Sequence, residues 1–366
     1  MYLETLKTTD FRNLEGRIAC RPGLNILVGD NGQGKTNWLE AIFLLATTRS
    51  FKTARLQETI RFGAEIALIG GQVRQSAEIV HDLQAVISPT SKAFAINGKR
   101  EPASRYIGEL HAVIFNADEL EVVRGHPEAR RRFLDNGIVS IYPAFLQTIT
   151  DYNRVIKQKN SLLQSGRDQE WTPEKTSEAL QPWNEQLATL SARIHKARTR
   201  FVERLNEVLE RHMFGSEDIS IRYASALEGK GDLSDYEALI SERLKLRAQA
   251  ELIAGHSLIG THRDDMEFKL DGHDLRRYGS SGQQRSALLL LLLANLAVFN
   301  SQRGEYPLFL LDDIDSELDY KRIGQLLEFL QNKTQTFATT SKENFVQNFG
   351  RSAAVFEIEN GRPKSL

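Results

Sequence analysis

A glycine-rich segment is the part of this sequence whose residue types are best suited to chemistry. It reads GDNGQGKTN over residues 29–37, after the apolar run 24–28 and before the largely apolar run 38–45. The spacing fits G-x-x-x-x-G-K-T, the phosphate-holding loop that joins a strand to a helix. The pattern predicts a nucleotide-binding loop made by Gly29, Asp30, Asn31, Gly32, Gln33, Gly34, Lys35, Thr36 and Asn37.

Each residue type in this loop has a physical task. Glycine lets the backbone turn so tightly that several amide N–H groups point at one phosphate. Lys35 would reach the β- and γ-phosphates of ATP, and the Thr36 hydroxyl would hold Mg²⁺. The alternative is a glycine-rich turn with a chance lysine. The strand and helix patterns on either side favour nucleotide binding.

Two neighbouring carboxylates form a second candidate group. The apolar run 308–311 is followed by Asp312 and Asp313. A buried parallel strand presents its C-terminal residues at the edge of the sheet where ligands bind. Asp312 is therefore a candidate Mg²⁺ ligand opposite Thr36, and Asp313 a candidate for polarising the attacking water. Buried strands also end in acidic turns that have no such role, but the phosphate loop favours the metal interpretation.

A serine–glycine turn precedes the most apolar run, residues 287–299. A helix start with hydroxyl groups and free N–H groups can bind an anion. Since one nucleotide does not need two cradles, this turn would face the nucleotide of a second subunit in a dimer. The alternative is a capped helix start, which these residues alone favour. The turn consists of Ser280, Ser281, Gly282 and Gln283.

Periodicity indicates which elements position these groups. Alternating residues at 83–87 and 93–96, with an Asn97–Gly98 turn, predict an antiparallel meander. Composition then changes to long charged helices over about 118–254, with an apolar stripe of period three to four between 187 and 208. We therefore expect an α/β fold in which residues 1–115 and 256–366 build one nucleotide domain, and residues 116–255 form an inserted α-helical lobe.

Composition bounds the class of protein. The chain has 366 residues, 41% hydrophobic and 26% charged, with a formal net charge of −1. Any nucleic-acid site must therefore be a local basic patch. The single cysteine excludes an intrachain disulfide and favours a reducing compartment. The N-terminus has no signal-peptide pattern, and the run 287–299 is too short to span a membrane. We expect a cytoplasmic protein without a membrane partner.

Six segments together resemble the ABC-type ATPase heads of the SMC and DNA-repair class, and within that class the RecF family of bacterial recombination mediators. They occur in the family's order along the whole chain. The segments are FRNLEG (11–16), GDNGQGKTNWLEAIFLLATTRSFK (29–52), HPEARRRFLD (126–135), GTHRDDMEF (260–268), YGSSGQQRSALLL (278–290) and LLDDIDSELD (310–319).

The resemblance implies a role for each motif. It implies an ABC-type P-loop ATPase head with a mixed β-sheet and an inserted helical lobe. Asp312 would be the magnesium aspartate, Asp313 and Lys35 catalytic groups, and Arg12 an early arginine near the nucleotide. The turn 280–283 would close on ATP across a head-to-tail dimer, and the interface loop with Ser316 and Asp319 would couple the two sites.

The sequence departs from the family pattern at several positions. The second carboxylate is Asp313 instead of glutamate, whose longer arm serves in transporter ATPases. The switch position offers Thr339, Thr340 and Ser341 instead of histidine. Thr261 replaces the usual proline of "GPHRDD", and Asn116 is the candidate for the glutamine that links the nucleotide to the helical lobe.

A basic helix flank predicts where DNA would bind. Arg193, Lys196, Arg200 and Arg204 recur at steps of three and four, with Arg198 on another side, and Arg130–Arg132 form a second cluster. Phosphate contacts from such residues would give salt-dependent binding with little sequence preference. A plain solvated helix face is the alternative that the stripe alone favours. The resemblance favours binding to duplex DNA.

The combined prediction is an ATPase that dimerises on ATP, binds double-stranded DNA or single-strand/double-strand junctions, and releases on hydrolysis. The resemblance places it in DNA damage repair, replication and the SOS response, where it would work with RecR and RecO to load the RecA recombinase. One alternative is the nucleotide-binding subunit of an ABC transporter. The other is a DNA-binding scaffold in which ATP is not hydrolysed.

Overall fold

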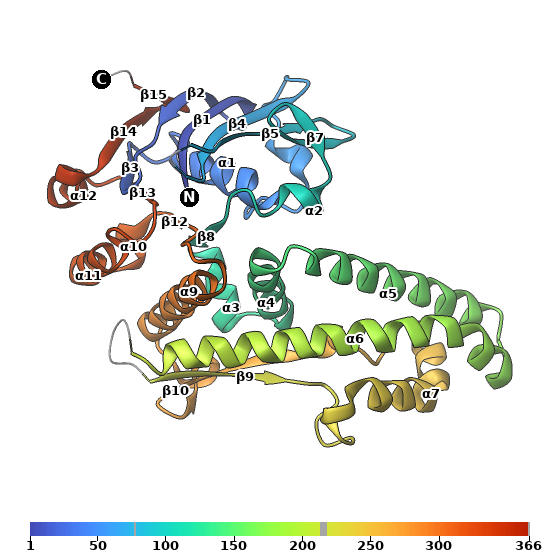
Figure 1. The fold of residues 1–366 in the computed structure, drawn as a ribbon. Helices are drawn as coiled ribbons and strands as arrows, with labels where there is room; N and C mark the ends of the chain where they lie inside the picture. The colour runs from blue at the N-terminus through green and yellow to red at the C-terminus, as the bar shows by residue number, and fades with distance from the viewer. Residues whose placement is uncertain (77, 213–217, 365–366) are drawn as a thin grey trace. The chain divides into compact units, whose positions relative to one another are not determined.

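The computed structural model describes residues 1–76, 78–212 and 218–364. The chain forms two compact units, which are drawn in Figure 1. The first unit consists of Met1–Leu120 and Arg285–Leu366, and the second of Glu121–Gln284.

These unit boundaries differ from the expected ones mainly in the second half of the chain. The second part of the nucleotide domain was expected to begin at residue 256, whereas residues up to Gln284 fall in the second unit. The physical reason is a strand pairing: β10 (Asp265–Leu270) forms an antiparallel ladder with β9 (Ile219–Ala224) of the same unit.

The first unit contains an antiparallel sheet with the strand order β2-β1-β4-β5-β6-β7. The expected meander is confirmed, because β4, β5, β6 and β7 pair consecutively. Asn97 and Gly98 join the last two strands with φ angles of 51° and 78°, the left-handed pair that a tight hairpin turn requires. The strands are β1 (Tyr2–Phe11), β2 (Leu14–Ala19), β4 (Ala67–Arg74), β5 (Val80–Ile87), β6 (Lys92–Ile96) and β7 (Lys99–Glu101).

A second sheet in this unit has the order β15-β14-β3-β13-β12-β8. All neighbouring pairs are parallel except β14 and β15. The C-terminal ends of β3, β13 and β12 therefore meet at one edge, where ligands bind in such sheets. The strands are β3 (Leu24–Val28), β8 (Ala112–Phe115), β12 (Leu308–Leu311), β13 (Thr336–Thr340), β14 (Ala354–Glu359) and β15 (Arg362–Pro363).

Helix α1 (Lys35–Thr47) follows the glycine-rich loop and contacts strands of both sheets. This position explains its apolar sequence, because Trp38, Leu39, Leu44 and Leu45 are wholly buried in the core of the unit. Burying these side chains on both sides fixes the helix N-terminus beside the edge of the parallel sheet. The other helices of the unit are α2 (Ala103–Tyr106), α10 (Ile314–Glu317), α11 (Tyr320–Leu330) and α12 (Glu343–Phe349).

Helix α9 (Ser281–Arg303) begins in the second unit and continues in the first. It is long and apolar enough to cross a membrane by length and composition, with a mean hydropathy of 1.3. However, 67% of its most apolar window is buried inside the protein, as in the core helix of a folded domain.

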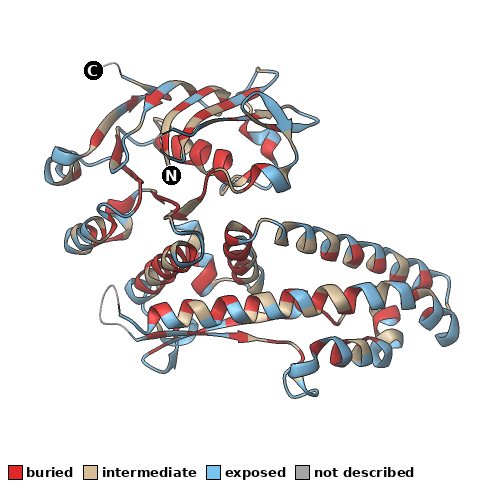
Figure 2. Ribbon diagram, in the orientation of Figure 1, coloured by how far each residue is buried: buried red, intermediate tan, exposed pale blue. Residues whose placement is uncertain are grey.

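The second unit is mainly helical, with α5 and α6 packed along each other (Figure 1). Figure 2 shows the buried stripe of α6, and Leu187, Ile194, Phe201 and Leu205 of the expected apolar pattern lie in it. The elements besides β9 and β10 are α3 (Glu121–Arg124), α4 (Pro127–Ile141), α5 (Phe145–Asp168), α6 (Pro173–Leu209), α7 (Tyr236–Ala254), α8 (Leu275–Tyr278) and β11 (His273–Asp274).

The expectation of helices throughout residues 118–254 is wrong for β9. Ile219, Ile221 and Tyr223 of this strand are buried while Ser220 and Arg222 are exposed. That two-residue alternation is a strand signal. It was missed because the strand is short and its partner β10 lies far along the chain.

A buried ion pair lies in the second unit. The Lys159 ammonium on α5 lies 2.7 Å from a Glu251 carboxylate oxygen on α7, and both side chains have no exposed area. The other Glu251 oxygen accepts hydrogen bonds from the Ser257 hydroxyl (2.9 Å) and the Leu258 N–H (2.8 Å). Burial lowers the pKa of Lys159, and the Glu251 carboxylate opposes that change.

Replacing Lys159 by methionine should destabilise the protein by about 3–5 kcal/mol, because a buried carboxylate loses its counter-charge. Urea unfolding followed by circular dichroism measures the change. Lys157→Met is the matched control, since Lys157 lies on the same helix and is exposed. Equal unfolding midpoints for the two variants would show that loss of the counter-charge of Glu251 does not destabilise the fold.

Candidate nucleotide-binding site

The glycine-rich loop joins β3 to α1 and depends on close backbone approaches. A Cβ atom on Gly29 would lie 2.4 Å from the Ile358 carbonyl oxygen, and one on Gly34 would lie 2.9 Å from the Asn13 side chain. Gly32 and Gly34 also have φ angles of 82° and 103°, which larger residues rarely adopt. The glycines of the motif are therefore required by the geometry of the loop.

Lys35 is held by the backbone of its own loop. Its ammonium group donates to the carbonyl oxygens of Gly29 (2.7 Å) and Asp30 (2.8 Å), and the residue is 8% exposed. Burial lowers the pKa of Lys35, while the nearby carboxylates of Asp313 and Asp312 raise it. The positive charge is thus concentrated at the helix N-terminus, the position that attracts phosphate.

Thr36 and Asp312 meet although they are far apart in the sequence. The Thr36 hydroxyl donates to Asp312 Oδ1 at 2.8 Å, and the Thr339 hydroxyl donates to the same oxygen at 2.8 Å. Burial raises the pKa of Asp312, and the two hydroxyl hydrogen bonds oppose that rise. The C-terminal ends of β12 and β13 and the start of α1 therefore form one polar centre.

The donor set of this centre suits Mg²⁺. A hydroxyl and a carboxylate are hard oxygen ligands, and protein Mg²⁺ sites commonly use one or two carboxylates together with nucleotide phosphates. Among residues 1–76, 78–212 and 218–364, no group of three or more His, Cys, Asp or Glu could hold a metal ion. A metal at Thr36 and Asp312 would therefore need further oxygen atoms from a nucleotide or water.

Asp313 lies beside this centre in an unusual conformation. It is exposed, its φ angle is 49°, and its N–H donates to the Thr339 hydroxyl oxygen at 2.8 Å. The residue precedes α10, but its carboxylate does not cap that helix. Thr339, one of three expected switch residues, is thus the one bonded to both aspartates, whereas the Thr340 hydroxyl accepts from the Lys342 N–H.

The structure adds residues to the site that the motif did not identify. The Lys52 ammonium donates to the Asn37 side-chain oxygen at 2.8 Å, and the Glu40 and Asp312 carboxylates raise its pKa while burial, the larger effect, lowers it. Ser50 donates to Glu40 at 2.6 Å. Glu40 is wholly buried. An acidic residue inside an apolar helix pattern was the sequence signal that polar partners such as Ser50 lie nearby.

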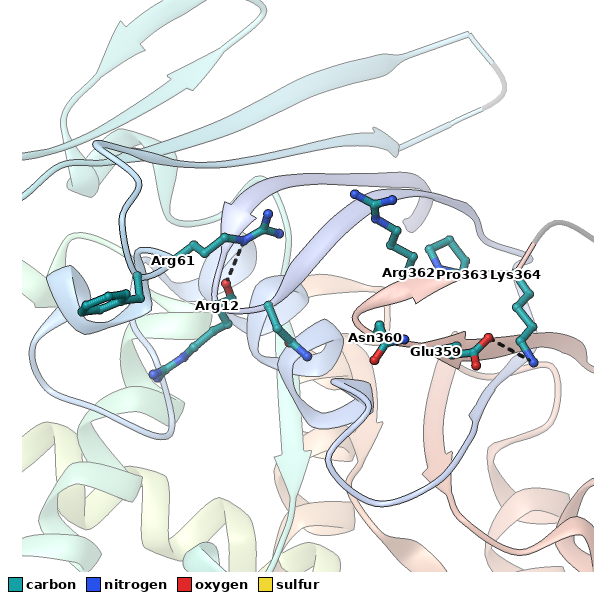
Figure 3. Close-up of a pocket in the computed structure, with 9 residues that line it drawn as sticks. Arg12, Arg61, Glu359, Asn360, Arg362, Pro363 and Lys364 are labelled. Atoms are coloured by element: carbon teal, nitrogen blue, oxygen red, sulfur yellow. Dashed lines mark hydrogen bonds and ion pairs between the residues drawn. The ribbon is translucent and has the colours of Figure 1, made fainter.

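Arg12 contacts α1 through its guanidinium group. The group makes two hydrogen bonds to the Glu40 carboxylate, at 2.8 and 3.0 Å. Arg12 also lines a pocket of about 780 Å³. Figure 3 shows Arg12 and Arg61 on one side of this pocket and Arg362, Pro363 and Lys364 on the other. The lining residues are Arg12, Asn13, Arg61, Phe62, Glu359, Asn360, Arg362, Pro363 and Lys364.

The serine–glycine turn before α9 forms a reciprocal helix cap. The Gln283 N–H donates to the Ser280 hydroxyl at 3.3 Å, and the Ser280 N–H donates to the Gln283 side-chain oxygen at 2.8 Å. This pattern is a capping box, so the capped helix start that the residues favoured is present. Ser281 and Gly282 are exposed beside it. Capping and contact with a second subunit are compatible.

The expected interface loop, residues 316–319, is tied to helices of the first unit. Ser316 and Asp319 are exposed, and the Asp319 carboxylate accepts from the Arg322 N–H at 2.9 Å as the cap of α11. Arg285 near the start of α9 pairs with Glu317 at 2.8 Å. Asn116, the expected linker position, is buried and accepts from the Glu119 N–H at 2.8 Å.

The basic flank of α6 is on the surface, whereas Arg198, expected on another side of the helix, is internal. Arg193, Lys196 and Arg200 are exposed, and Arg204 donates to the Tyr142 hydroxyl at 3.1 Å. Arg198 is instead 4% exposed and makes two hydrogen bonds to the Asp135 carboxylate.

The expected surface cluster at residues 130–132 is wrong for Arg130. This side chain is buried and pairs with Asp265 at 2.6 Å, while Arg131 donates to the Asp264 carbonyl at 2.7 Å. Arg132 remains exposed. The partners lie on β10 and the segment before it, more than a hundred residues along the chain, so the sequence pattern alone did not reveal them.

Comparison with known proteins agrees with this architecture. Residues 2–364 match the family model described as RecF/RecN/SMC N terminal domain. The chain is 37% identical to a protein of Ligilactobacillus salivarius (strain UCC118) named DNA replication and repair protein RecF, over 99% of this chain and 97% of that protein. A Synechococcus protein (strain JA-3-3Ab) of the same name is also 37% identical, over the same shares.

Solved structures show the same fold. A structure described as the recombination mediator protein RecF-ATP in the RecFOR pathway matches with a TM-score of 0.90 and 28% identity, over 100% of this chain and 97% of that one. A structure of RecF-ATPrS matches with a TM-score of 0.89 and 29% identity, over 100% and 98%. The expected fold class, an ABC-type ATPase head, is confirmed, and the chain belongs to the RecF family of DNA replication and repair proteins.

Proposed function

We propose that this chain is an ATP-dependent DNA-binding protein that dimerises on ATP, binds duplex DNA or single-strand/double-strand junctions, and is released by ATP hydrolysis. The observation that carries this proposal is the 2.8 Å hydrogen bond between Thr36 and Asp312, which joins the phosphate loop to the acidic end of β12. Two sequence motifs of an ATPase site thus meet in one place.

In this proposal Lys35 and the loop N–H groups bind the β- and γ-phosphates of ATP. Thr36 and Asp312 would hold Mg²⁺, which would supply positive charge against the phosphates. Asp313 accepts a proton from the water that attacks the γ-phosphorus, and the bond from that phosphorus to the β–γ bridging oxygen breaks to give ADP and phosphate. The Thr339 hydroxyl donates to the Asp312 carboxylate and accepts from the Asp313 N–H, so it fixes the positions of the two aspartates relative to each other.

The family relationship supports the cellular role. The relatives are named for DNA replication and repair, and the matched structures are described as a recombination mediator of the RecFOR pathway. We infer that this chain works in the cytoplasm with RecR and RecO to load the RecA recombinase at gaps and stalled forks. The transporter alternative lacks support from these relatives. The scaffold alternative, in which ATP is bound but not hydrolysed, is addressed by the Asp313 variant below.

The first experiment is binding to labelled duplex DNA with ATP and Mg²⁺, with ADP, and without nucleotide, at several salt concentrations. We expect binding with ATP only, weakening as salt rises because phosphate contacts release counterions. Replacing both Arg193 and Arg200 by alanine should lower the salt slope by up to about 1.8, at about 0.9 for each lost phosphate contact. Binding that ignores the nucleotide would contradict the proposal.

The matched control for this pair is Lys99→Ala/Arg100→Ala, which removes two exposed charges from β7. It should leave the salt slope unchanged. If both double variants lower the slope equally, α6 is not the DNA-binding surface.

Replacing Ser281 by arginine should block dimerisation while ATP still binds. The exposed serine leaves space for a second subunit, and a long charged side chain there would have to be desolvated. We expect ATP affinity within about twofold of wild type and ATP-dependent dimerisation weaker by at least about tenfold. Sedimentation velocity measures the dimer. Ser352→Arg, at another exposed serine, is the control, and normal dimerisation of Ser281→Arg would exclude the turn from the interface.

A further inference from the structure

The turn between β14 and β15 contacts the phosphate loop directly. The Gly361 N–H donates to the Gln33 carbonyl oxygen at 2.8 Å, and the Asn360 N–H donates to the Gln33 side-chain oxygen at 2.6 Å. Both acceptors of one loop residue are therefore satisfied by two consecutive N–H groups near the far end of the chain.

Gly361 fits this position because it has no side chain. Its φ angle is 79°, and a Cβ atom there would lie 2.0 Å from the Asn13 carbonyl oxygen. The Gly361 carbonyl also accepts from the Glu15 N–H at 3.3 Å. The Asn360–Gly361 turn thus lies between the phosphate loop and the β1–β2 turn. Asn13 of the β1–β2 turn also accepts a hydrogen bond from the Asn37 side chain at 2.8 Å.

The hydrogen bond to Gln33 determines where the next N–H points. In a trans peptide the carbonyl of one residue and the N–H of the following residue point in opposite directions. No cis peptide bond occurs among the described residues. Because the Gln33 carbonyl is bound to Gly361, the Gly34 N–H points away from the hairpin. Gly34 precedes the lysine of the motif, and its N–H is one of the groups that can cradle phosphate.

We propose that the Asn360–Gly361 turn is a positioning element of the nucleotide site, which holds the Gln33–Gly34 peptide so that its N–H faces the phosphates. The proposal rests on the proposed function, namely that the loop binds ATP. Asn360 of the turn also lines the pocket that Arg12 lines, together with Glu359 of β14 and Arg362 of β15 (Figure 3). The β14–β15 hairpin thus borders both the phosphate loop, through Gln33, and this pocket.

The test is Gly361→Ala, and the chain offers a matched control. Asn97–Gly98 is a second Asn–Gly hairpin turn in the same unit, with φ angles of 51° and 78° against 50° and 79° for Asn360–Gly361. A Cβ atom on Gly98 would meet nothing within 4 Å. Both glycine-to-alanine changes place alanine at a positive φ angle and therefore strain the backbone equally. Only the change at Gly361 also forces the turn away from Asn13 and Gln33.

We expect Gly361→Ala to raise the Kd of both ATP and ADP by about tenfold, the scale for losing a hydrogen bond to a charged group, with Gly98→Ala close to wild type. KM for ATP should rise while kcat stays within about twofold, since Asp312 and Asp313 do not contact the turn. Gln33→Ala, which keeps the backbone bond but removes the side-chain acceptor, should raise Kd less and serves if Gly361→Ala does not fold.

Equal ATP affinities of Gly361→Ala and Gly98→Ala, with Gln33→Ala unchanged, would overturn the positioning role. A Lys35→Ala variant measured in parallel distinguishes failure of the positioning role from failure of the proposed nucleotide site. If it loses ATP while the turn variants do not, the nucleotide site stands and the positioning role fails. If Lys35→Ala also binds normally, the proposed nucleotide site itself is wrong.

Discussion

Replacing Lys35 by alanine is expected to weaken ATP binding by at least about 100-fold, since two or more charge-assisted hydrogen bonds to phosphate are lost. The structure holds the Lys35 ammonium at the N-terminus of α1 against two loop carbonyls, within the influence of Asp312 and Asp313. No second lysine or arginine replaces it in the loop 29–37. Fluorescent-nucleotide titration or calorimetry measures the affinity.

The control for this change is Lys7→Ala, which removes an exposed lysine from β1 in the same unit. Its ATP affinity should equal that of wild type. ATP affinity of Lys35→Ala within tenfold of wild type would mean that Lys35 does not contact the phosphates.

Local patterns in the sequence were sufficient to predict the strand–loop–helix arrangement of the glycine-rich segment, the buried strand before Asp312 and the meander. In each case neighbouring residues carry the signal: glycine spacing, an apolar run, or an Asn–Gly turn. The same holds for the cap at Ser280 and Gln283, whose two hydrogen bonds span three residues. Such features depend little on the rest of the fold.

Features that depend on distant pairing could not be predicted. Thr339 occupies the centre of the site only because β13 lies between β3 and β12, and no local pattern specifies that strand order. Arg130 and Arg198 looked like surface charges because Asp265 and Asp135, which neutralise them, are remote in sequence. The contact between Gln33 and the Asn360–Gly361 turn joins nearly the two ends of the chain.

Replacing Asp313 by asparagine is expected to lower ATP turnover by about 10²–10⁴-fold, the range for losing a general base. Asparagine tolerates the left-handed backbone that Asp313 adopts, and its N–H can still donate to Thr339, so the fold and Asp312 should be undisturbed. ATP affinity should stay within about threefold, because the phosphate loop is unchanged. Single-turnover hydrolysis with DNA present measures the effect, and the ATP-bound dimer should persist longer than in wild type.

Asp271→Asn provides the matched control, because Asp271 is also exposed and has the same φ angle of 49°. It should hydrolyse ATP at the wild-type rate, which separates the loss of a carboxylate at the site from the loss of a charge in a strained turn. Turnover in Asp313→Asn equal to that in Asp271→Asn would remove Asp313 from the chemistry. It would then favour the scaffold alternative, in which ATP is bound as a ligand and is not hydrolysed.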